Sequence, residues 1–206
     1  MRYQHITTED LNNSNRIYRA HLINSLSGYK SVNLIATLHE NGSANLGVFS
    51  NIVHIGADPA LIGFINRPRE AAPHTLSNIE RTGKYTINHI HKEIVLQSHQ
   101  CSAKYPEDVS EFEVNGLTPE IIEGLPVPFV KESRVKYFVN LVEIVPIKHN
   151  NTFLVIGNIT EIFLFPGIME EDGFISLEKA GSLCSLGTDA YYSPEMITRL
   201  PYAKVR

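Results

Sequence analysis

The sequence lacks the features of membrane and secreted proteins. It has no tryptophan, only two cysteines among its 206 residues, and no apolar run close to the roughly 20 residues that a membrane helix requires. Its N-terminal segment has no apolar core of the kind that a signal peptide needs. We therefore expect a cytoplasmic protein that does not enter the membrane, in which Cys101 and Cys184 remain free thiols.

Positive charge is also scarce. The chain has 18 Lys and Arg against 22 Asp and Glu, a formal net charge of -4, and no basic block, so binding to nucleic acid has no electrostatic support. Proline and glycine are spread along the chain, and no stretch looks like a linker. With 43% hydrophobic residues, the sequence predicts a single domain over residues 1–206.

Hydrophobic patterning favours strands over helices. Strands are predicted at residues 31–38, 45–55, 61–65, 84–90, 134–147 and 152–165, and helices at 15–26, 76–81 and 92–100. Turn residues at 39–43 and 150–151 predict that residues 31–38 pair with 45–55, and that 134–147 pair with 152–165. Residues 1–15 and 102–130 are expected to be loops, and Gly157 a bulge. The sequence predicts a mainly β barrel or sandwich with helical decoration, and no Rossmann domain.

Residues 44–69 form the first candidate site. Two strands joined at Asp58-Pro59 carry polar residues among apolar ones, and Gly47 allows a close approach to the backbone. The polar residues are Asn45, Ser50, Asn51, Arg67 and Arg69. Hydrogen-bonding groups over an apolar floor, with cations at one end, suit a planar heteroaromatic ligand with a phosphate tail. The alternative is an ordinary core hairpin with polar edges.

The helix predicted after Thr75 adds to this candidate. Thr75 is expected to cap the helix, Gly83 to end it, and His74 to lie beside the arginines. A helix N-terminus presents free N–H groups and partial positive charge, which favour phosphate. The alternative is a plain capped helix next to two solvated arginines.

Other reactive residues form no recognisable motif. His89, His91, His99 and Cys101 could bind a metal or make a nucleophilic pair, but no spacing supports either, so we predict no metal site and assign no catalytic residue. The loop at 102–130 is expected to be a lid or binding arm. Its acidic residues are expected to form a solvated face: Glu107, Asp108, Glu111 and Glu113.

Several segments, taken in their order along the chain, resemble the flavin reductase-like family of FMN-binding split β-barrels, which are antiparallel and Greek-key-like. The resemblance covers residues 17–195. It is carried by A-N-L-G-V-F-S-N-I-V-H-I-G-A-D-P-A-L-I-G-F, N-R-P-R, T-L-S-N-I-E-R-T-G-K-Y-T-I-N, S-A-K-Y-P-E-D-V-S-E-F-E-V-N-G-L-T-P and the closing L-G-T-D-A-Y-Y.

The resemblance implies where FMN would bind. The ring would lie along residues 45–51 and the phosphate at the arginines and the helix start. The candidate cofactor residues are Asn45, Leu46, Gly47, Val48, Ser50, Asn51, Arg67, Arg69, His74 and Thr75. It also implies a homodimer with the cofactor at the interface, where residues 102–106 and 187–191 would complete the site.

The resulting functional hypothesis is an NAD(P)H:FMN oxidoreductase. Hydride would pass from NADH or NADPH to flavin N5, a reaction that needs little acid–base help from the protein. Reduced flavin would serve a monooxygenase or another acceptor. Two alternatives remain open at this point: a non-enzymatic FMN-binding or flavin-carrier protein of the same fold, and an interaction module that has lost flavin.

Overall fold

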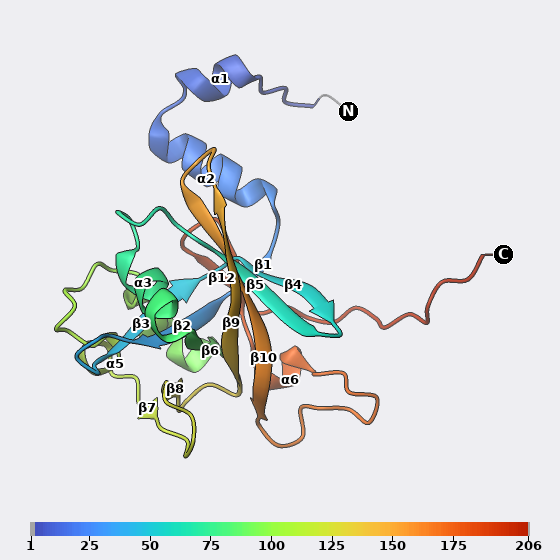
Figure 1. Ribbon diagram of the computed structural model, residues 1–206. Coiled ribbons are helices and arrows are strands. Elements are labelled where there is room, and N and C mark those ends of the chain that lie inside the picture. The colour runs from blue at the N-terminus through green and yellow to red at the C-terminus, as the bar shows by residue number, and fades with distance from the viewer. Residues whose placement is uncertain (1–2, 206) are drawn as a thin grey trace.

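The computed structural model describes residues 3–205, and a seven-stranded antiparallel sheet forms its centre (Figure 1). The strand order is β3-β2-β6-β9-β10-β5-β4. The bounds are β2 (Asn33–Leu38), β3 (Ala44–Phe49), β4 (Ile52–Ala57), β5 (Ala60–Asn66), β6 (Lys84–His89), β9 (Val135–Ile147) and β10 (Thr152–Leu164). This confirms the prediction of a mainly β, antiparallel fold.

Smaller elements surround the sheet. A three-stranded sheet has the order β1-β11-β12, and β7 pairs with β8. These strands are β1 (Lys30–Ser31), β7 (Pro119–Glu120), β8 (Phe129–Val130), β11 (Cys184–Leu186) and β12 (Ala190–Tyr192). The helices are α1 (Thr8–Asn13), α2 (Arg16–Leu26), α3 (Pro73–Thr82), the 3-10 turn η1 (Lys92–Ile94), α4 (Val95–Gln100), α5 (Glu111–Asn115) and α6 (Leu177–Ala180). Among residues 3–205, every helix is too short or too polar to cross a bilayer.

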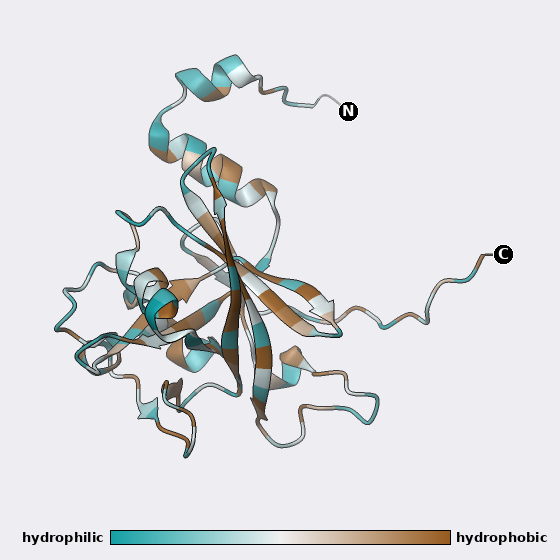
Figure 2. Ribbon diagram, in the orientation of Figure 1, coloured by the Kyte–Doolittle hydropathy of each residue, from teal (hydrophilic) through white to brown (hydrophobic). Residues whose placement is uncertain are grey.

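Two hydrophobic clusters pack against opposite faces of the sheet. Leu34 belongs to the cluster that contains Phe112 of α5, whereas its neighbour Ile35 belongs to the cluster that contains Leu76 and Ile79 of α3. Adjacent strand residues point to opposite faces, so one strand supplies both clusters. Figure 2 shows the hydrophobic residues concentrated on the strands.

The predicted long hairpin is confirmed, and so is its bulge. β9 and β10 pair along their whole length, with a register shift between Ile156 and Gly157. A Cβ at Gly157 would lie 2.3 Å from Tyr85 Oη and 2.3 Å from Val139 Cγ1. Only glycine therefore fits where β6 and β9 approach the bulge.

The prediction of one continuous strand over residues 45–55 is wrong. β3 ends at Phe49 and pairs with β2, whereas β4 begins at Ile52 and pairs with β5 at the other edge of the sheet. The side chain of Asn51 explains the break, because its Nδ2 donates to Ile65 O (2.9 Å) and its Oδ1 accepts from Ile65 N–H (3.3 Å). Two residues thus connect the edge strands, and the sheet curves into a barrel.

One helix prediction and two loop predictions also need correction. Residues 8–13 form α1 instead of a loop, and a capping box between Thr7 and Asp10 stabilises the N-terminus of this helix. α3 begins at Pro73 with Ala72 as its N-cap, so Thr75 lies in the first turn and is not the cap. Proline at the first helical position needs no N–H partner, which explains the earlier start. Residues 102–130, expected as loop, contain α5, β7 and β8.

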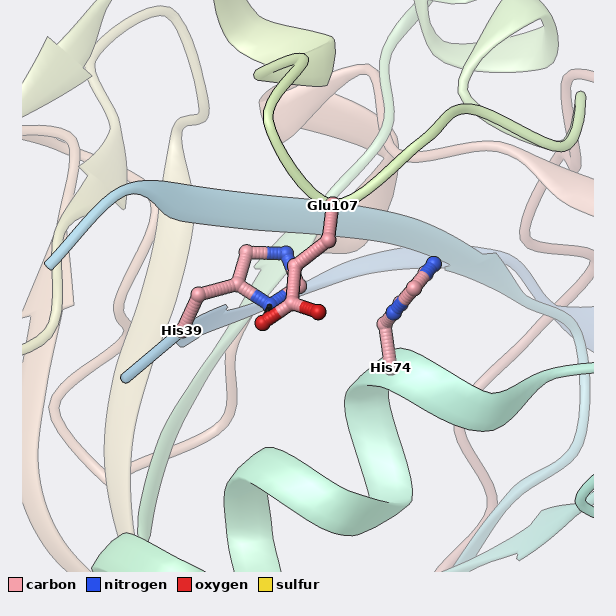
Figure 3. Close-up of side chains that lie close together, drawn as sticks. All are labelled: His39, His74 and Glu107. Atoms are coloured by element: carbon pink, nitrogen blue, oxygen red, sulfur yellow. Dashed lines mark ion pairs between the residues drawn. The ribbon is translucent and has the colours of Figure 1, made fainter. Parts of the chain in front are cut away.

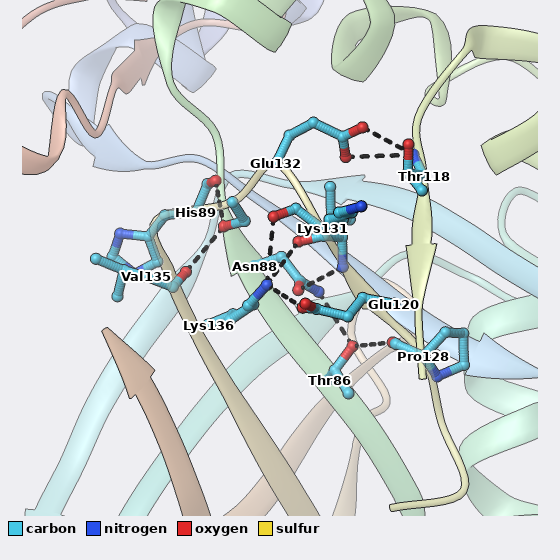
Figure 4. A network of polar contacts seen from close by, with 12 residues as sticks. Thr86, Asn88, His89, Thr118, Glu120, Pro128, Lys131, Glu132, Val135 and Lys136 are labelled. Carbon is cyan, nitrogen blue, oxygen red and sulfur yellow. Dashed lines mark hydrogen bonds and ion pairs between the residues drawn. The ribbon is translucent and has the colours of Figure 1, made fainter. Parts of the chain in front are cut away.

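Polar contacts fasten residues 118–132 to the sheet (Figure 4). Thr86 Oγ1 donates to Pro128 O (2.8 Å), and Asn88 Oδ1 accepts from Val130 N–H (2.9 Å). Lys136 Nζ forms an ion pair with Glu120 and lies largely out of solvent. These bonds explain how a proline-rich segment keeps a fixed course over β6 and β9.

Candidate functional site

A cavity of about 310 Å³ opens beside the edge strand β3. Its lining consists of residues 45–51, 65, 67, 70–75, 101–105 and 111. Nine of the ten predicted cofactor residues are in this lining: Asn45, Leu46, Gly47, Val48, Ser50, Asn51, Arg67, His74 and Thr75. The structure therefore brings together residues from the strand, the arginine loop and the start of α3.

The backbone of β3 supplies the polar floor of this cavity. Opposite residues in an antiparallel pair alternate between hydrogen-bonded and non-hydrogen-bonded positions. Leu46 lies opposite Ala36 and gives its N–H to Glu111 Oε2 at 2.9 Å, so Leu46 and Val48 are in non-hydrogen-bonded positions. Their other backbone groups consequently point away from β2, toward the cavity, and offer both donors and acceptors to a flat ligand.

Glu111 was expected in a solvated acidic face, and this prediction is wrong. Its side chain is buried at the cavity wall, where it accepts the Leu46 N–H. Burial raises the pKa of Glu111, and the Leu46 hydrogen bond opposes that effect. Glu111, which belongs to α5, thus satisfies a buried backbone donor of β3 that has no partner in β2.

Asn45 connects β3 to α3. Its Nδ2 donates to Thr37 Oγ1 and to Thr75 Oγ1, both at 3.1 Å, and all three residues are buried. Asn78 Nδ2 donates to the same Thr37 hydroxyl at 3.0 Å. A Cβ at Gly47 would lie 3.2 Å from the Phe49 ring and 3.5 Å from Thr75 Oγ1. The network holds the N-terminal turn of α3 close to the strand at the cavity floor.

The two arginines do not share one place. Arg67 lines the cavity together with residues 72–75 at the N-terminus of α3, where backbone N–H groups and partial positive charge favour an anion. Arg69 instead forms a bidentate ion pair with Glu80 and lies 5.0 Å over the Phe153 ring. This pairing raises the pKa of Arg69 and lowers that of Glu80. Arg69 is not among the residues that line the cavity.

The three histidines that the sequence offered as possible metal ligands do not converge. His89 Nδ1 contacts Ser182 Oγ (3.1 Å), and burial lowers the pKa of His89 to about 4. His91 contacts Glu93 and the Glu132 carbonyl, and His99 contacts Tyr191 Oη (2.8 Å). In the described part of the chain, none of these three belongs to a group of metal-ligating side chains.

Cys101 lies in the cavity wall, but its thiol is not set up as a nucleophile. Burial, with a contribution from Glu111, raises the pKa of Cys101 to about 12, so the reactive thiolate is scarce near neutral pH. Residues 102–105 also line the cavity, as expected for a binding arm. Tyr191 of the closing segment lies outside the lining and contacts α4 through His99.

Sequence reasoning missed several lining residues: Phe49, Ile65, Glu70, Ala71, Ala72, Pro73, Cys101 and Glu111. Pro73 begins the helix and residues 70–72 lie just before it, so a correct helix start would have drawn attention to them. Glu111 gave no local signal, because its partner Leu46 is 65 positions away.

Residues 50–51 connect the two edge strands of the antiparallel sheet, which therefore curves into a barrel. This arrangement, with a cavity at one edge strand, is that of a split-barrel protein. The chain belongs to the flavin reductase like domain family, whose model matches residues 28–176. This confirms the resemblance inferred from the sequence and places the chain in a flavin-binding family.

Solved structures agree with this family. A chain assigned as a flavin reductase with a split barrel domain, from Shewanella frigidimarina NCIMB 400, is 46% identical, with a TM-score of 0.94 over 98% of this chain and 100% of that chain. Nitrilotriacetate monooxygenase component B from Bacillus cereus is 20% identical (TM-score 0.85; 97% and 100% covered). An FMN-binding protein from Thermus thermophilus is 14% identical (TM-score 0.69; 98% and 98%). The last two show a shared fold.

Proposed function

We propose that this protein binds FMN in the β3 cavity and reduces it with NADH or NADPH. The observation that carries the proposal is the edge strand whose backbone donors and acceptors face a cavity with an anion site at one end. A flavin has a polar pyrimidine edge on a flat apolar ring and a phosphate at the end of its tail, and the residues present fit both parts. An FMN-binding protein of the same fold supports the choice of ligand.

The proposal assigns roles to the lining residues. The backbone at Leu46 and Val48, with Ser50 and Asn51, would meet the ring. Arg67, the α3 N-terminus and Thr75 would meet the phosphate, with His74 nearby, whereas Arg69, paired with Glu80, would not contact it. FMN, when bound, supplies the hydride-accepting chemistry. The protein's part is to orient the ring and neutralise the phosphate, and we assign no catalytic acid or base.

Assembly and partners are proposed on separate grounds. Within the described helix α2 no residue is buried, and four large apolar side chains are exposed: Ile17, Tyr18, Ile23 and Leu26. An exposed apolar helix is typical of an interaction surface, which supports a homodimer. The Bacillus cereus structure is a monooxygenase component, and this supports a role in supplying reduced flavin to an oxygenase or another acceptor.

The alternative is a flavin carrier without nicotinamide turnover. Both hypotheses require FMN binding, and the same cavity would serve either. Anaerobic addition of NADH or NADPH to the FMN-loaded protein separates them, because bleaching of the flavin absorption supports the reductase and names the donor. An oxidised spectrum that persists with both nucleotides contradicts the reductase and favours the carrier.

Arg67 provides the direct test of the binding site. FMN titration of Arg67→Ala, followed by flavin fluorescence, is expected to show affinity lower by about 1–3 kcal/mol, or about 5- to 150-fold, because a charge-assisted phosphate bond is lost. Arg69→Ala is the matched control, since Arg69 is paired outside the cavity lining. Equal FMN affinity in both variants and the unchanged protein would refute the phosphate site at Arg67.

A further inference from the structure

Two histidines and a glutamate converge at the rim of the cavity, and the proposed flavin chemistry does not account for their arrangement. His39 follows β2 in the turn to β3, His74 lies in the first turn of α3, and Glu107 belongs to the segment just after the cavity-lining residues 101–105. One potential ligand atom from each side chain lies within 4.8 Å of the other two. Figure 3 shows the Glu107 carboxylate reaching down from its loop beside the two imidazoles.

The distances are close to those of a metal site. His39 Nδ1 lies 3.4 Å from Glu107 Oε1. Tetrahedral ligands with bonds of about 2.0–2.2 Å to zinc are separated by roughly 3.3–3.5 Å, so this pair already has the required spacing. The His74 ring lies 5.2 Å from the His39 ring, centroid to centroid, and the two planes are inclined by 79°. His74 is half-buried in the first turn of its helix, and one of its ring nitrogens already lies within 4.8 Å of the other two ligand atoms.

The neighbours of His39 fix its ring beside the Glu107 carboxylate. Asn78 Nδ2 points at His39 Nδ1 from 3.4 Å while it donates to Thr37 Oγ1 at 3.0 Å. His39 Nδ1 thus has the Asn78 amide nitrogen on one side and the Glu107 carboxylate oxygen, at 3.4 Å, on the other. An unprotonated Nδ1 at this distance from a carboxylate oxygen is favoured when a cation binds both atoms. Asn78 therefore holds the buried imidazole beside the Glu107 carboxylate, as a residue behind a metal ligand does.

We propose that His39, His74 and Glu107 bind a divalent metal ion of the zinc type at the rim of the cavity. Imidazole nitrogen and carboxylate oxygen are the usual ligands of zinc besides thiolate, and three protein ligands leave one coordination position for water. The ion would join the segment after residues 101–105 to α3 and thereby hold one wall of the cavity. This site goes beyond the proposed flavin function, because none of its three ligands requires FMN.

The test uses the full chain without a histidine tag, stripped of metal with a chelator and kept free of FMN. Calorimetric titration with Zn²⁺ is expected to show one ion per chain, and Co²⁺ is expected to produce the visible absorption bands of a low-coordinate site. Glu107→Gln and His74→Ala are each expected to weaken Zn²⁺ binding about tenfold or more, as loss of a ligand should. His149→Ala is the matched control, since His149 is exposed in the turn between β9 and β10.

The outcomes are distinct. Glu107 is largely exposed, so Glu107→Gln does not threaten folding, and its circular dichroism is expected to match that of the unchanged protein. Zn²⁺ is also expected to slow amide hydrogen exchange at residues 104–109 in the unchanged protein and not in Glu107→Gln. The proposed site would be overturned if the unchanged protein failed to bind Zn²⁺. It would also be overturned if Zn²⁺ affinity were equal in Glu107→Gln, His74→Ala and His149→Ala. Because FMN is absent, neither result depends on the flavin proposal.

Discussion

Glu111 offers the sharpest test of how the cavity is built. Glu111→Ala removes the acceptor of the Leu46 N–H, which is fully buried in the edge strand. A buried donor without a partner costs about 1–3 kcal/mol, and the lost side chain leaves a void next to α5. We expect the free energy of unfolding to fall by about 2–3 kcal/mol. Glu111→Gln keeps an acceptor oxygen in nearly the same place, so its stability is expected to stay within about 1 kcal/mol of the unchanged protein.

The two variants also differ in how their stability depends on pH. Burial raises the folded-state pKa of Glu111 above that of the unfolded chain, near 4.3. The folded state therefore binds this proton more tightly, and ionisation of Glu111 costs stability as pH rises through the folded pKa. Glutamine does not ionise. The stability of Glu111→Gln relative to the unchanged protein is expected to increase as the pH is raised from about 4 to 7.

Urea denaturation of flavin-free protein measures both effects. With a slope of about 2–3 kcal/mol per M, the midpoint of Glu111→Ala should lie about 1 M below that of the unchanged protein, with the slope itself unchanged. The pH series repeats the measurement for Glu111→Gln and the unchanged protein. The reasoning is refuted if Glu111→Ala and Glu111→Gln have the same urea midpoint. It is also refuted if the stability of Glu111→Gln falls relative to that of the unchanged protein as the pH rises.

Two further predictions concern packing and the thiols. Gly157→Ala is expected to lower the free energy of unfolding by about 1–3 kcal/mol, because its Cβ would lie 2.3 Å from Tyr85 Oη. Gly56→Ala, whose Cβ would lie 3.4 Å from its nearest neighbour, is the control in the same urea assay, and equal midpoints would contradict the argument. At pH 8, a thiol reagent is expected to modify half-exposed Cys184 first and Cys101 only after unfolding, because the pKa of Cys101 is about 12. Rapid modification of Cys101 in the folded protein would show that its thiol is accessible and ionised.

Local pattern was sufficient where the partner strand is close in sequence. The sequence predicts the β9–β10 hairpin because residues 134–147 alternate and a short asparagine turn joins them to a second strand-like segment. The same reasoning failed at residues 45–55, where β-branched residues continue past Phe49. The break there comes from Asn51, whose amide bonds to Ile65 fourteen positions away. No property of the strand residues themselves reports that contact.

Part of the candidate site could likewise be predicted from the sequence, and part of it could not. Asn45, Ser50, Asn51 and Arg67 could be identified from their chemistry in a short stretch, and the structure places them around one cavity. Arg69 could not be separated from Arg67, because its partner Glu80 lies on the next helix. Thr75 was expected as a cap because it precedes an apolar run, although Pro73 already indicated the earlier start of α3.

The edge of the sheet explains why the cavity lies where it does. An unpaired edge strand exposes backbone groups that must be covered or bonded, and in this protein α5 packs against β3 while Glu111 bonds to one of its N–H groups. The remaining groups of β3 face the cavity, where a ligand that offers matching donors and acceptors would complete the edge as a neighbouring strand does. Such a ligand binds the folded chain and not the unfolded one, so it stabilises the fold by an amount that grows with its concentration. Ligand affinity and the stability of the β3 edge are therefore two measures of the same set of hydrogen bonds.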